Sequence, residues 1–71
     1  MNDHGEDPER AIEQKLAGLR QEHQDLDSAV RAVEEQALPD QLLIARLKKR
    51  KLALRDQITM LEDQLTPDII A

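Results

Sequence analysis

Residues 33–44, VEEQALPDQLLI, decide the fold, because Pro39 interrupts a chain whose composition otherwise favours one long helix. A proline inside a helix removes a backbone hydrogen bond and costs roughly 3 kcal/mol. It also biases the preceding residue, Leu38, away from helical geometry. Asp40 can accept hydrogen bonds from the free N–H groups that begin a new helix. This stretch therefore predicts a turn at about residues 38–40 between two helices.

Before this turn, apolar residues recur at alternating intervals of four and three. His23 is the one polar member of a series that otherwise contains Ile12, Leu16, Leu19, Leu26, Val30, Val33 and Ala37. Such spacing places the side chains in one stripe along a helix, the seam of a heptad repeat. Asp7 and Pro8 suit a helix start, as a cap and as the first helical residue. We expect a first helix over about residues 8–37.

After the turn, a second seam has the same spacing. Lys51 is its one polar member, and the others are Ile44, Leu47, Leu54, Ile58, Leu61 and Leu65. Thr66 and Pro67 end the pattern, because the residue before a proline avoids helical geometry. We expect a second helix over about residues 41–66 and a tail over 67–71. Residues 1–6, which contain Gly5 and polar side chains, are expected to be a disordered tail.

The two seams match each other if the chain folds back at Pro39. Each seam residue then faces a residue of the other seam, and the two residue numbers of every facing pair add up to 77. Each such layer joins an a position of one heptad to a d position of the other, as antiparallel helices require. The layers are Val33 with Ile44, Val30 with Leu47, Leu26 with Lys51, His23 with Leu54, Leu19 with Ile58, Leu16 with Leu61, and Ile12 with Leu65. The sequence therefore predicts an all-α fold, an antiparallel two-helix coiled-coil hairpin spanning residues 7–66.

The composition excludes several classes of protein. The 71 residues allow one domain, and they contain no Cys, Phe, Tyr or Trp. Disulfides and aromatic platforms for stacking bases are therefore absent. No segment has the roughly 18 consecutive apolar residues of a membrane span, and the N-terminus does not resemble a signal peptide, so we expect a cytoplasmic location.

Chains this short rarely build a core that contributes more than a few kcal/mol, so we expect self-association into a helical bundle, as a dimer or larger assembly.

Two sets of residues in the second helix are candidates for interaction. Leu42, Leu52 and Met60 lie off the seam and are either a self-association surface or scattered surface apolar residues. The basic segment comprises Arg46, Lys48, Lys49, Arg50, Lys51 and Arg55. It is either a solvated helix face or a contact for phosphate, anionic lipid or an acidic protein. The net charge of −5 disfavours general nucleic-acid binding.

The two polar seam residues also leave alternatives open. His23 either lies over Leu54 and Leu26 or titrates near physiological pH and weakens the hairpin when protonated. Lys51 either specifies register from within the core or extends its ammonium group towards Asp27.

The residues needed for catalysis are missing. The usual nucleophiles are scarce, because Cys and Tyr are absent and Ser28 is the single serine. The carboxylates are expected on convex helix surfaces that do not exclude water. His4 lies in the expected tail, and His23 has one carboxylate, Asp27, a helical turn later, which is fewer ligands than the three or four protein side chains of a typical metal site. We therefore expect no catalytic residues, no bound metal and no cofactor.

The segments EHQDLD, residues 22–27, and LKKRKL, residues 47–52, are similar to those of the YdcH-like family of small coiled-coil proteins, a family of unknown function. The resemblance covers nearly the whole of both expected helices. It implies a helical hairpin in a bacterial cytoplasm and implies no reaction. Arg55 stands before Asp56 where the family often has Lys, which conserves the charge.

Together these patterns predict a small cytoplasmic interaction or structural protein with an unknown protein partner. The alternative function is a nucleic-acid-associated or anionic-surface-binding regulator that uses the basic segment.

Overall fold

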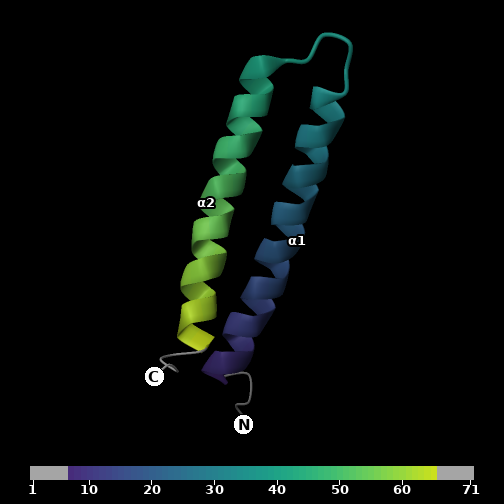
Figure 1. The fold of residues 1–71 in the computed structure, drawn as a ribbon. Helices are drawn as coiled ribbons and strands as arrows, with labels where there is room; N and C mark the ends of the chain where they lie inside the picture. Colours follow the sequence, from purple (N-terminus) through teal and green to yellow (C-terminus); the bar gives the residue numbers. More distant parts are fainter. Residues whose placement is uncertain (1–6, 66–71) are drawn as a thin grey trace.

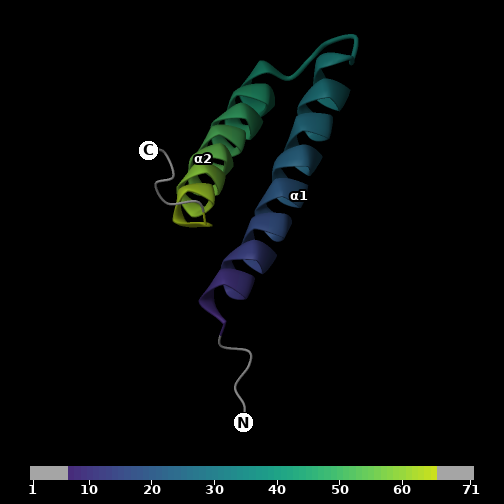
Figure 2. The ribbon, with the colours of Figure 1, turned by 60° about the horizontal axis from the view of Figure 1, so that its bottom comes forward.

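The structure of the protein, a computed structural model, describes residues 7–65. It contains two helices, α1 over Pro8–Glu34 and α2 over Gln41–Leu65. They run antiparallel, side by side, and are joined by one loop (Figures 1 and 2). The predicted all-α helical hairpin is thereby confirmed. The expected tails over 1–6 and 67–71 and the expected helical residue Thr66 lie outside the described residues.

Both helices begin at the aspartates that the sequence indicated. The Asp7 carboxylate accepts hydrogen bonds from the backbone N–H groups of Glu9 and Arg10, at 3.0 and 3.4 Å. The Asp40 carboxylate accepts one from Leu43 N–H at 3.0 Å. Each cap satisfies donors that have no partner within the helix, which is why Asp is favoured at these positions.

The helix α1 ends at Glu34, three residues earlier than the expected end at about residue 37. Glu35 N–H closes the last turn on the carbonyl of Arg31, and residues 35–40 form the loop. Ala37 is exposed outside the helix and therefore does not extend the seam. A loop longer than the expected turn has a physical reason. The proline disfavours helix before it, and the chain must cross the 8–10 Å that typically separate packed helix axes.

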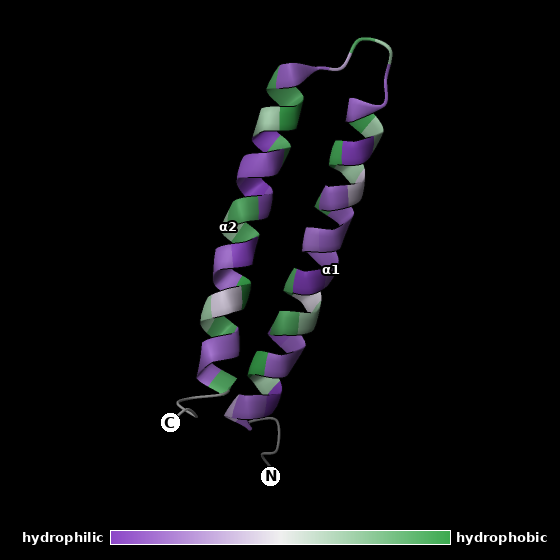
Figure 3. Cartoon of the chain, in the orientation of Figure 1, coloured by the Kyte–Doolittle hydropathy of each residue, from purple (hydrophilic) through white to green (hydrophobic). Residues whose placement is uncertain are grey.

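The core is the line of contact between the two seams. The fully buried side chains are Leu16, Val30, Ile44 and Leu54, two from each helix. Every other seam residue between Ile12 and Leu65, apart from the loop, is half-buried. In Figure 3 apolar segments alternate with polar ones along the length of both helices, as a heptad repeat requires. The burial pattern confirms the predicted seams of α1 and α2.

The ion pairs between the helices fix their register independently of the seam. Arg20 with Glu62 and Glu34 with Lys48 have residue numbers that total 82, and Glu22 with Arg50 totals 72. In an antiparallel pair, the two residue numbers of a facing pair add up to the same total in every core layer. On one flank of the seam the corresponding total is larger by five, and on the other flank it is smaller by five. The midpoint is 77, the total predicted from the apolar residues.

Candidate functional site on the surface of the second helix

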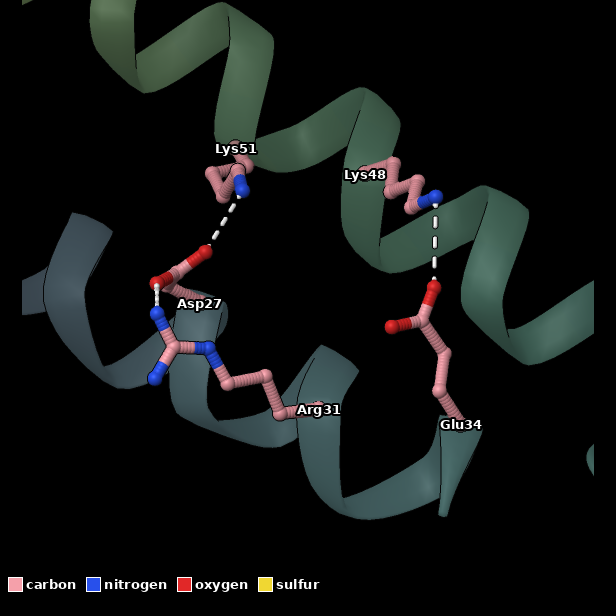
Figure 4. Close-up of polar contacts among 5 residues, drawn as sticks. All are labelled: Asp27, Arg31, Glu34, Lys48 and Lys51. Carbon is pink, nitrogen blue, oxygen red and sulfur yellow. Dashed lines mark hydrogen bonds and ion pairs between the residues drawn. The ribbon is translucent and has the colours of Figure 1, made fainter.

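The seam residue Lys51 extends its ammonium group out of the core to Asp27. Its side chain is only 26% exposed, yet Nζ lies 2.7 Å from Asp27 Oδ1 (Figure 4). The aliphatic stem of a lysine can cover apolar surface while its charged end reaches water and a carboxylate. Of the two alternatives for Lys51, extension towards Asp27 is the one confirmed.

Asp27 is held by two cations at once. Besides Lys51 it contacts Arg31 one turn later in α1, with 3.1 Å between Arg31 Nη2 and Asp27 Oδ2. The hydrogen bond from Lys51, the charge of Lys51 and, more weakly, the charges of Arg31 and His23 lower the pKa of the Asp27 carboxyl, while desolvation opposes them. Asp27 therefore remains ionised to a lower pH in the hairpin than in the unfolded chain.

His23 is half-buried at its predicted place in the seam. Within residues 7–65 its imidazole has no hydrogen bond or ion pair, unlike the neighbouring polar layer at Lys51. The role of His23 as a pH-sensitive element stays a prediction.

Acidic residues of α1 form ion pairs with three of the six residues of the basic segment. Lys48 Nζ lies 3.3 Å from Glu34, Arg50 Nη2 lies 2.8 Å from Glu22, and Lys51 pairs with Asp27. Figure 4 shows two of these contacts bridging the helices. The partners of Lys48 and Arg50 were not predicted from the sequence.

The remaining basic residues, Arg46, Lys49 and Arg55, are exposed and form no ion pair with any other residue of the described range. Three cations spread over ten residues, in a chain of net charge −5, make a weaker positive patch than the sequence alone suggested. Pairing with α1 therefore removes much of the electrostatic basis for binding a polyanion.

The second candidate surface is an apolar line on the side of α2 that faces away from α1. Leu42, Leu52 and Met60 are 62%, 61% and 59% exposed. Ala45 and Ala53 lie between them and are also exposed. These five residues are called the outer face of α2 below. In contrast, the exposed large apolar side chains in residues 7–65 include none from α1.

Leu38 and Leu43 are two further large apolar residues that are exposed within residues 7–65. Leu38 is 89% exposed in the loop, and Leu43, beside the seam at the start of α2, is 37% exposed. Leu38 precedes Pro39 and lies off both seams, so its position in the sequence already indicated exposure.

A concavity lies at the open end of the hairpin. A cavity of about 340 Å³ is lined by Pro8, Glu9, Ile12, Gln64 and Leu65. One carboxylate and one amide accompany its apolar lining, and the described residues hold no group of three or more potential metal ligands. The helices between residues 7 and 65 are also too polar for either to cross a membrane.

The fold and surface define a class of protein, a helical hairpin held by a seam and by ion pairs between its helices. A family model described as "Protein of unknown function (DUF465)" matches residues 16–62, well over half of the chain. The chain therefore belongs to this family, and the YdcH-like resemblance is confirmed. The matched segment contains the four ion pairs between α1 and α2 described above. No curated protein and no solved structure matched the chain.

Proposed function

We propose that this protein is a non-catalytic cytoplasmic interaction module that binds a protein partner through the outer face of α2. The carrying observation is the exposure of Leu42, Leu52 and Met60, three large apolar side chains along one side of one helix. Single exposed apolar residues are common, but a line of them along one face is typical of an interface.

The size of the core supports this proposal. Among residues 7–65, only four side chains are fully buried. Because ordering each residue costs about 1.5 kcal/mol in conformational entropy, a core this thin stabilises a chain of this length only marginally. Covering the outer face of α2 would add apolar burial of the kind that the hairpin lacks, at about 25 cal/mol for each Å² removed from water.

A second candidate function is the binding of an anionic surface through the basic segment. It is favoured by Arg46, Lys49 and Arg55, which keep their charges exposed and form no ion pair within residues 7–65. It is disfavoured by the acidic residues of α1, which hold the other three cations. Such binding would weaken by orders of magnitude between low and physiological ionic strength, whereas apolar association would hardly change.

The experiment that tests the proposal is affinity capture from an extract of the native cell. The baits are the tagged wild-type chain, Leu52→Glu and Leu38→Glu. The last is a matched control, because it introduces the same charge at a leucine that is more exposed but lies in the loop. We expect partners retained by wild type and by Leu38→Glu to be lost by Leu52→Glu, at low and at physiological salt alike.

Two results would contradict the proposal. If the three baits retain the same proteins, the outer face of α2 does not bind them. If retention is lost with salt and is insensitive to Leu52→Glu, but falls when Arg46, Lys49 and Arg55 are replaced by Gln, the anionic-surface function is correct instead.

A further inference from the structure

A second heptad line runs along α2, away from α1. Its members are spaced by 4, 3, 4, 3 and 4 residues, and all of them are exposed: Leu42, Arg46, Lys49, Ala53, Asp56 and Met60. At 100° per residue this line lies roughly 150° around the helix from the seam that packs on α1. The helix α2 therefore carries the spacing required to pack against one helix on each of two sides.

We propose that the occupant of this line is a second copy of the chain, whose α2 packs antiparallel so that facing residues have numbers totalling 102. The proposal rests on the function proposed above, in which the outer face of α2 is the binding face. Leu42 of one copy would face Met60 of the second copy, Arg46 would face its Asp56, and Lys49 would face its Ala53. The two-fold axis generates the same three layers with the roles of the two copies exchanged. An apolar layer closes each end of the contact.

Charge complementarity selects this arrangement. Arg46 and Asp56 are exposed, and within the described part of the chain neither forms an ion pair. In the antiparallel register, Arg46 of each copy faces Asp56 of the other copy. The two-fold symmetry therefore gives two such pairs of opposite charge. A parallel pairing in register would instead place Arg46 against Arg46 and Asp56 against Asp56, which are repulsive contacts.

The neighbouring antiparallel register fits less well. A total of 101 would face Leu42 with Thr59, Lys49 with Leu52, and Asp56 with Ala45, so that two charges meet apolar side chains. In the register of 102, Leu52 lies on the flank of the contact, opposite Ala45 of the second copy. The large side chain thus meets a small one, as close helix packing requires.

The extent of the contact suits reversible association. From Leu42 to Met60 the helix is about 28 Å long, at 1.5 Å per residue. One pair of helices in contact over that length is at the small end of specific interfaces, so we expect dissociation in the range of roughly 10 µM to 1 mM. The two copies of α1 would lie on the outside of the dimer, with their polar faces in solvent.

The first test exchanges the two charges. Sedimentation over roughly 10 µM to 1 mM should show self-association of wild type, and a dissociation constant at least about tenfold higher for Arg46→Asp and for Asp56→Arg, since each variant faces itself with like charges. An equimolar mixture of the two variants should associate to within about threefold of wild type, because each layer then joins opposite charges. The control Arg55→Asp makes the same charge change on the flank towards α1 and should associate like wild type.

The second test locates the register. The chain has no cysteine, so Leu42→Cys and Met60→Cys each carry a single thiol. In the proposed dimer the two Leu42 positions lie at opposite ends, as do the two Met60 positions. Each variant alone should therefore remain without an intermolecular disulfide, whereas a mixture of the two should form the Leu42→Cys to Met60→Cys disulfide on mild oxidation.

The proposal is overturned if wild type remains monomeric at the highest concentration, if the charge-exchanged mixture stays dissociated, or if Leu42→Cys alone cross-links as fast as the mixture. These failures are separate from a failure of the proposed function. A monomeric wild type whose cellular partners are still lost by Leu52→Glu would show that the outer face of α2 binds another protein.

Discussion

The two helices of the hairpin bury similar seams but differ on their other sides. They are 27 and 25 residues long, and each contributes two of the four fully buried side chains. Away from the seam, α1 presents polar residues such as Gln21 and Asp25, whereas α2 presents Leu42, Leu52 and Met60. The helix α1 therefore has apolar surface on the side of its one helix neighbour, whereas α2 exposes large apolar side chains on a second side as well.

The largest expected difference in the free energy of unfolding is between alanine substitutions of two leucines of α2 that lie two residues apart. Leu54 is 4% exposed and Leu52 is 61% exposed. Leu54→Ala should lower the free energy of unfolding by about 2–5 kcal/mol, which is enough to unfold much of this small hairpin. Leu52→Ala should change it by less than about 0.5 kcal/mol in dilute solution. Urea titration followed by circular dichroism measures both, and equal losses would show that the two sides of α2 do not differ.

A smaller, stabilising effect is expected at the polar layer of α1. His23→Leu places an apolar side chain opposite Leu54 in a half-buried position, so the hairpin should gain about 1 kcal/mol and melt at a higher temperature. The thermal transition at neutral pH gives the answer. A lower melting temperature than wild type would mean that the imidazole makes a specific polar contact which Leu cannot replace.

Gly18→Ala tests the polar side of α1. A Cβ added at Gly18 meets nothing within 4 Å, so the substitution acts only through helix propensity. It should stabilise the hairpin by about 0.5–1 kcal/mol, since glycine has more backbone freedom to lose on folding. Sedimentation of the same variant should match wild type. Weaker self-association would place an interface on α1 and remove the contrast between the helices.

The smallest effect concerns Asp27, the carboxylate that links the helices through Lys51. Its pKa is lower in the hairpin than in the unfolded chain, so the unfolded chain binds more protons as the pH falls. The contribution of Asp27 to stability is therefore fully present above the ordinary carboxyl pKa and is lost as pH falls through the lower value in the hairpin. Asp27→Asn should melt below wild type at pH 7.

The melting temperatures of Asp27→Asn and wild type should converge in acid, measured from pH 7 to pH 2. Asp25→Asn is a suitable control, because within residues 7–65 the Asp25 carboxylate accepts a hydrogen bond from Gln21 of its own helix and forms no ion pair with α2. A difference between Asp27→Asn and wild type that stays constant over this range would mean that the ion pair with Lys51 contributes nothing to folding.

The fold was predictable because its determinants are periodic. The heptad spacing of apolar residues indicated both helices, and the interruption at Pro39 indicated the reversal between them. The end of α1 at Glu34 was not predicted, because the length of a loop depends on the distance that it must span between packed helices. Ala37 fits the heptad by spacing alone, yet nothing in the sequence shows that the helix no longer continues there.

The candidate site was predictable in its residues and less so in its contacts. Leu42, Leu52 and Met60 stand off the seam, so their exposure followed from the same periodicity. The partners of Lys48 and Arg50 were missed, because flexible side chains can reach several carboxylates and the sequence does not rank them. This difference matters for function, since those pairs decide how much positive charge the basic segment offers to a partner.

The register of the hairpin places Arg20 beside Glu62, with 2.7 Å between Arg20 Nη2 and Glu62 Oε2. The most direct measurement is the rate of disulfide formation within single molecules of Arg20→Cys/Glu62→Cys at high dilution. This rate is compared with that of Arg20→Cys/Arg55→Cys. In this second variant the α2 thiol lies seven residues earlier, on the same flank of the seam. We expect the first pair to close within the monomer much faster than the second, because a shift of one heptad moves the two thiols about 10 Å further apart along the helices. Equal rates, or closure only between molecules, would contradict the hairpin and the two-sided role of α2.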